Sequence, residues 1–125
     1  MARLIDQSQA RRLGLPGRSS LEPISGALGS RCSVRIATIA VPQPGTKRGP
    51  HLHDGFEEVI YVLSGSGAMH AESGEIPIKP GDLVLVPAGE KHMTHHTGDV
   101  PLVLLCFFPV PDVGAGTTQF ASFDS

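Results

Sequence analysis

Glycine and proline interrupt this sequence at short intervals, so that no helical periodicity develops after residue 20. The 125 residues include 15 Gly and 11 Pro, and the runs between them are short and rich in Val, Ile, Leu and Phe. Such punctuation marks turns between strands. We predict an all-β protein with strands over residues 31–41, 51–53, 57–64, 67–72, 75–78, 82–87, 92–97 and 101–108. Strands of this number and spacing form a sandwich or a small closed barrel.

The two ends of the chain lack this strand pattern. Residues 2–13 are compatible with a short helix or a flexible arm, and "GLPGRSS" interrupts what precedes it. The tail is small and polar, and its Phe120 and Phe123 leave two alternatives open, a mobile tail or one anchored on the body or on a neighbouring subunit. We therefore expect an N-terminal arm over 1–20, one β domain over 21–110 and a C-terminal tail over 111–125.

Composition argues against several classes of partner. The net charge is −2 and no run of Lys and Arg stands out, which disfavours nucleic acid and anionic membrane surfaces. No apolar run approaches the roughly 20 residues that span a bilayer, and the N-terminus lacks the apolar core of a secretion signal. Cys32 and Cys106 each lie in an apolar stretch and are expected to be buried free thiols. A cytoplasmic protein is the resulting expectation.

The stretch "HLHDGFEEVIYVLSG" places His51 and His53 two residues apart, on the same face of a predicted strand. Glu57 and Glu58 follow, and because neighbours point to opposite faces only one of them can join the histidines. Strand alternation alone does not choose between them. His92 comes just after the turn at 87–89, where a reversal brings it back beside the preceding strand. Imidazole and carboxylate together suit Mn, Fe, Co, Ni, Cu or Zn better than Ca or Mg.

These residues and their spacing resemble the two motifs of the cupin family. The first runs from Gly45 to Gly65 as Gly, five residues, His-x-His, three or four residues, Glu, six residues, Gly, and the six-residue spacing to Gly65 selects Glu58 over Glu57. The second runs from Gly81 to His92. The resemblance implies a small all-β barrel of jelly-roll type and a divalent transition metal held by His51, His53, Glu58 and His92.

The second motif of the family usually ends in Asn, where this chain has His96. Residues 92, 94 and 96 of one strand share a face, but four residues of strand span roughly 13 Å, which is too far for His96 to join the same metal. His96 is therefore either a cavity-lining catalytic acid or base, or a core histidine that hydrogen-bonds where Asn would lie. His95 and His70 are expected at the surface. Lys47 and Arg48 would either steer an anionic substrate or remain solvated.

The resemblance leaves two classes of function open. One is a metalloenzyme that acts on a small polar molecule as a dioxygenase, sugar isomerase or epimerase, decarboxylase or lyase. The other is a non-catalytic module in which the metal is structural or orients a bound ligand. An isomerase or lyase needs an acid or base, for which His96 or Tyr61 is available, although Tyr61 fails if Glu58 faces inward. A dioxygenase needs mainly a metal and an apolar pocket, which we expect from Ile60, Val62, Val84 and Val86.

The run "PLVLLCFFPV" over residues 101–110 is apolar on both faces. One face must fill the barrel, and the other must be covered by a second sheet or by another subunit. This pattern favours a homodimer.

Overall fold

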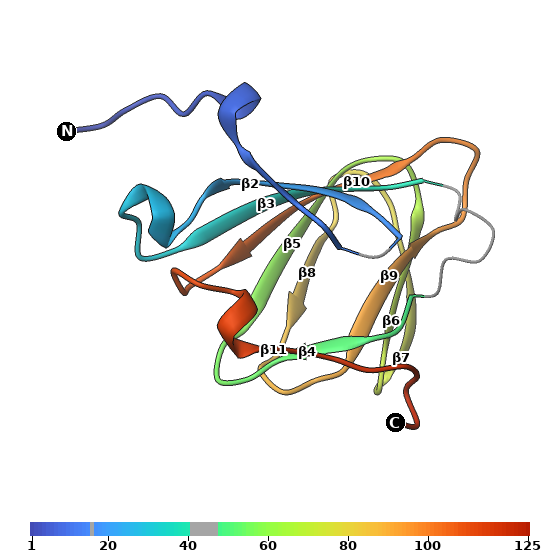
Figure 1. Ribbon diagram of the computed structural model, residues 1–125. Helices are drawn as coiled ribbons and strands as arrows, with labels where there is room; N and C mark the ends of the chain where they lie inside the picture. The colour runs from blue at the N-terminus through green and yellow to red at the C-terminus, as the bar shows by residue number, and fades with distance from the viewer. Residues whose placement is uncertain (16, 41–47) are drawn as a thin grey trace.

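The computed structural model describes residues 1–15, 17–40 and 48–125 (Figure 1). The motif residue Gly45 and the loop residue Lys47 lie outside these ranges. In the described ranges the only helices are three 3-10 turns, and none is long and apolar enough to cross a membrane. The elements are η1 (Gln7–Gln9), β1 (Arg11–Leu13), β2 (Ser19–Ile24), η2 (Gly26–Leu28), β3 (Ser33–Ile39), β4 (His51–His53), β5 (Glu58–Ser64), β6 (Gly67–Ala71), β7 (Gly74–Ile78), β8 (Leu83–Val86), β9 (His92–His96), β10 (Leu102–Phe108), η3 (Gly114–Gly116) and β11 (Thr117–Gln119).

The strands form two antiparallel sheets that face each other as a jelly-roll barrel. One sheet has the order β1-β2-β3-β10-β5-β8 and the other has the order β11-β4-β9-β6-β7 (Figure 1). All eight strands predicted between residues 31 and 108 are present, with ends that differ by up to two residues. The all-β prediction is therefore confirmed.

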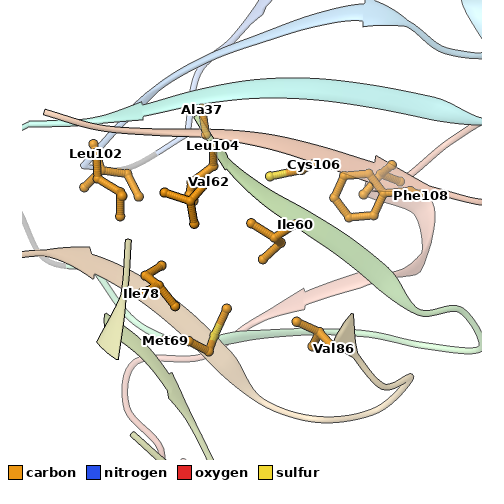
Figure 2. Close-up of a cluster of buried hydrophobic side chains, with 12 residues drawn as sticks. Ala37, Ile60, Val62, Met69, Ile78, Val86, Leu102, Leu104, Cys106 and Phe108 are labelled. Carbon is orange, nitrogen blue, oxygen red and sulfur yellow. The ribbon is translucent and has the colours of Figure 1, made fainter. Parts of the chain in front are cut away.

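Strict alternation along the central strands builds the core between the sheets. Along β10, Leu102, Leu104, Cys106 and Phe108 are buried, and Figure 2 shows them packed beside Ile60 and Val62 of β5. Because residues two apart share a face, Glu58 points inward with Ile60 and Val62. Tyr61 points outward and is 39% exposed, so it fails as an interior acid or base.

The outer face of the same sheet keeps an apolar surface. Tyr61, Leu83, Leu85 and Phe107 are exposed on β5, β8 and β10. Register places Tyr61 opposite Leu83, and it places Val59 between Leu85 and Phe107. This is the surface that a second subunit would cover, and the homodimer stays a prediction.

Both ends of the chain join the barrel. The strand at the N-terminal end was not predicted, whereas anchoring of the tail was one of the two alternatives left open. Residues 2–13 form the short 3-10 helix η1 and then β1, which pairs with β2, so that this hairpin extends the larger sheet beyond β3. At the other end β11 pairs with β4. The Phe123 ring lies 4.2 Å from the His70 ring, and Lys91 Nζ lies 4.2 Å from the Phe120 ring, both measured to ring centroids. The tail is thus anchored on the body of the domain.

Gly65, the last residue of the first motif, has a backbone that other residues adopt with difficulty. Its φ is +78°, and an added Cβ would lie 2.2 Å from the carbonyl oxygen of Pro101. Gly81 has a similar φ of +91°, as a type II turn requires, but an added Cβ there meets nothing within 4 Å. A comparison of alanine substitutions at the two glycines therefore separates the cost of the left-handed backbone, which both share, from the cost of a steric contact, which only Gly65 has.

We predict that Gly65→Ala destabilises the barrel more than Gly81→Ala does. The left-handed conformation alone costs about 1–2 kcal/mol in either variant. Gly65→Ala adds an overpacking cost of about 1–3 kcal/mol, because backbone must move to admit the methyl group. Urea unfolding of both variants and the wild type measures the difference, and equal losses of stability would contradict it.

Candidate metal centre

Four side chains from three strands converge inside the barrel. β4 supplies His51 and His53, β5 begins with Glu58, and β9 begins with His92. His51 and His92 are direct cross-strand partners, which brings their rings to a centroid distance of 4.3 Å. One potential ligand atom from each of the four residues lies within 4.8 Å of the other three. The structure therefore brings together all four residues that the sequence singled out as ligands.

Glu58 is the centre of this cluster. Its Oε1 atom lies 3.2 Å from His53 Nε2 and 3.0 Å from His92 Nε2. All three side chains are buried, and Glu58 is only 4% exposed. Burial by itself would raise the pKa of Glu58, but its contacts with His53 and His92 outweigh this effect and lower that pKa. The carboxylate is therefore ionised although it is buried.

The opposite ring nitrogens of the two histidines are held by hydrogen bonds of their own. His92 Nδ1 donates to the carbonyl oxygen of Glu90 at 2.9 Å. His53 Nδ1 lies 2.9 Å from Thr117 Oγ1, whose hydroxyl donates to the carbonyl oxygen of Val113 at 2.6 Å. Thr117 Oγ1 must therefore accept a hydrogen bond from the N–H group at His53 Nδ1. Both imidazoles, when neutral, thus direct the Nε2 lone pair toward Glu58, as outer hydrogen bonds do for metal-ligating histidines.

Two lone pairs and an ionised carboxylate oxygen repel one another unless a positive charge lies among them. A proton on Nε2 supplies that charge for His92: burial would lower the pKa of this residue, but Glu58 outweighs burial and raises it. A metal ion held by all four residues would supply it for the whole cluster. Burial and the neighbouring His92 lower the pKa of His51 to about 3, so this ring is neutral, and its buried Nδ1 has no hydrogen-bond partner among the described residues. Three imidazoles and one carboxylate are a donor set that fits a divalent transition metal.

The cluster opens into a cavity of about 110 Å³ between the two sheets. Its walls come from the inner faces of both sheets and from the tail, and the lining residues are Leu15, Arg18, Ser20, Arg35, Ala37, Ile39, His51, His53, Glu58, Ile60, His92, Thr94, Leu104, Cys106, Phe108, Gly114, Thr117 and Gln119.

Two sequence-based expectations for the cavity need correction. Ile60 is the one residue, of the four expected to form the apolar wall of the cavity, that lines it. Val62 and Val86 are instead buried in the hydrophobic core, and Val84 packs against that core. β3 and β10 supply the wall instead. His96 is half-buried on β9, opposite Gly67, and it does not line the cavity, whereas Thr94 of the same strand does. A catalytic role for His96 stays a prediction that the geometry of the cavity does not support.

The remaining histidines and cysteines lie outside the cluster. His95 hydrogen-bonds to Glu75 at 2.8 Å near the surface. His70, expected to be exposed, is half-buried against Phe123. Cys106 is a buried free thiol as expected, whereas Cys32 is free but only half-buried.

Comparison with known proteins gives a consistent result for the barrel. The sequence model of a family described as "Cupin domain" matches residues 38–108. An "Oxalate-binding protein" of Thermotoga maritima is 39% identical over 62 residues, which are 50% of this chain and 51% of that protein. The chain spans about half the length of the curated relatives it matches.

Solved structures share the fold. An oxalate decarboxylase of Bacillus subtilis superposes with a TM-score of 0.74 at 21% identity, over 91% of this chain and 31% of that one. The polyketide cyclase RemF of Streptomyces resistomycificus gives a TM-score of 0.74 at 20% identity, over 99% of this chain and 89% of that one. At such identities the likeness supports the fold.

We predict that Thr117→Val weakens metal binding by about 10–100-fold, the range typical for loss of an outer-shell partner of a ligating histidine. The substitution keeps the shape of the side chain but removes the acceptor that fixes the His53 tautomer. Thr118→Val is the matched control, because Thr118 is the exposed neighbour on the same strand. Competition with a chelator measures both affinities, and equal affinities would contradict the role of Thr117.

Proposed function

The chain belongs to the cupin family, and from this premise we propose that it binds a small carboxylate-bearing molecule beside a divalent transition metal. His51, His53, Glu58 and His92 would hold the metal. The observation that supports this most strongly is the orientation of His53 and His92, whose Nδ1 hydrogen bonds direct both Nε2 lone pairs at one buried carboxylate. Such a metal, when bound, would polarise a carbonyl or carboxyl group or supply redox chemistry.

The size of the cavity supports a small ligand. Pockets for drug-sized molecules usually measure about 300–1,000 Å³, whereas this cavity measures about 110 Å³. Ile39, Leu104 and Phe108 supply an apolar part of its wall, which would shield one side of a bound ligand from water. A molecule of a few heavy atoms suits such a space.

The names of similar proteins support a carboxylate as the ligand class. The Thermotoga maritima relative is an oxalate-binding protein, and the Bacillus subtilis structure is an oxalate decarboxylase. Because the matches span about half of the relative and about a third of the decarboxylase, oxalate serves here as the first probe of the site.

The residues around the cavity bear on whether the bound molecule also reacts. Beyond the four proposed ligands, the titratable side chains among its described lining residues are Arg18, Arg35 and Cys106. Burial, with the nearby charge of Glu58, raises the pKa of Cys106 well above its ordinary value, so the thiol stays protonated. With no free general base in this lining, metal-dependent binding is favoured, and decarboxylation or oxygenation at the metal suits the site better than an isomerase or lyase that relies on a protein base.

We predict that the purified protein carries near-stoichiometric transition metal and that Glu58→Gln reduces this content strongly. The amide keeps the size of the side chain but removes the charge among the imidazoles. Glu57→Gln is the matched control, because Glu57 lies immediately before Glu58 in the chain and its carboxylate is exposed. Elemental analysis gives the content, and circular dichroism checks that each variant is folded.

Two outcomes decide the proposal. The proposal is supported if the wild type and Glu57→Gln both carry metal and if oxalate binding requires that metal. Release of carbon dioxide from bound oxalate would add a decarboxylase activity. Failure of the wild type to retain any transition metal after reconstitution would overturn it.

A further inference from the structure

Two arginines line the cavity, and their surroundings differ. Arg35 is matched by a carboxylate, because its Nε lies 2.8 Å from Glu22 Oε2. The same carboxylate accepts from Arg11 at 2.7 Å, and the Arg35 guanidinium lies 5.4 Å from the centroid of the Phe108 ring. Arg35 is therefore already paired within the fold.

Arg18 has no such partner in the part of the chain that the structure describes. It precedes β2 directly and lines the same cavity as the four-residue cluster. No described carboxylate lies within ion-pair distance of its guanidinium. Arg18 is partly buried, and removing a guanidinium from water is unfavourable unless another group satisfies its hydrogen bonds and charge. The cavity itself is the place from which a partner can come.

A second positive charge lies beside Arg18. The Nε atom of Arg48 is buried and has no hydrogen-bond partner among the described residues. Burial and the adjacent charge of Arg18 lower the pKa of Arg48 to about 10. Burial likewise lowers the pKa of Arg18, and Glu58 acts in the opposite direction. Arg18 therefore lines the cavity together with the four-residue cluster, and its neighbour Arg48 is not among the lining residues.

We propose that Arg18 is a specificity-determining residue that binds the carboxylate of the ligand, while a second oxygen group of the same molecule faces His51, His53, Glu58 and His92. The inference rests on the proposed function and names its ligand class more narrowly, as a small acid with two oxygen functions. A guanidinium binds a carboxylate through two parallel hydrogen bonds, which fixes orientation as well as charge.

Arg18 and the four proposed metal ligands come from different parts of the chain. Residues 38–108 match the family and contain all four proposed ligands. Arg18 lies outside that segment, on the hairpin that β1 and β2 add to the larger sheet. The core barrel would hold the metal, and the added hairpin would select the ligand.

The test compares oxalate with its uncharged diamide, oxamide, by titration calorimetry on metal-loaded protein. The wild type should prefer oxalate, and Arg18→Gln should weaken oxalate binding by about 10–100-fold, the range for hydrogen bonds to a charged group. Arg18→Lys should bind oxalate more tightly than Arg18→Gln but less tightly than the wild type. Lysine keeps the positive charge but lacks the paired N–H donors of a guanidinium. Arg12→Gln is the matched control, since Arg12 is an exposed arginine of the same hairpin.

Metal content is measured on every variant, and it should be the same in Arg18→Gln as in the wild type. An Arg18→Gln protein that keeps its metal and still prefers oxalate would overturn the proposal, and so would a wild type that binds both probes equally. If no variant holds metal, the proposed function fails by itself. The preference of the metal-free wild type for oxalate, and its loss in Arg18→Gln, would then still decide the role of Arg18.

Discussion

The Nε2 atoms of His53 and His92 lie 3.2 and 3.0 Å from the same carboxylate oxygen of Glu58, in a site that water barely reaches. Hydrogen bonds at Nδ1 fix the direction of both lone pairs, so the contact is stable only when a positive charge lies in it. A proton can supply this charge for one ring. A transition metal would supply it for both rings and would also engage His51, whose neutral ring is held beside them. The chemistry proposed for the cavity depends on this need for a positive charge among Glu58, His53 and His92.

Strand register creates that contact, and each strand near the site has a part in it. Pairing of β4 with β9 sets His51 opposite His92, and pairing of β4 with β11 sets His53 opposite Thr117. Glu58 reaches them from the facing sheet, because it shares the inner face of β5 with Ile60 and Val62. The tail is therefore part of the site, since without β11 the His53 tautomer would lose its fixed partner.

Sequence analysis predicted the strands between residues 31 and 108 and missed the strands near the two ends of the chain. The strands between residues 31 and 108 were predicted from their apolar runs, and motif spacing placed Glu58 on the inner face. β1, β2 and β11 escaped prediction because they are short or polar. β1 and β2 add in turn to the edge of β3, and β11 adds to the distant strand β4, so Arg18 and Thr117 escaped with them. Alternation gives the face of a residue but not its height in the barrel, which explains why Val62 lies in the core and His96 beyond the cavity.

Anomalous diffraction from crystals of the reconstituted protein, measured at the absorption edge of its metal, tests the central claim most directly. The account predicts one strong peak within bonding distance of His51, His53, Glu58 and His92, with the Nδ1 hydrogen bonds to Thr117 and Glu90 retained. A fully reconstituted crystal without a peak there, in which Glu58 stays hydrogen-bonded directly to protonated histidines, would contradict it.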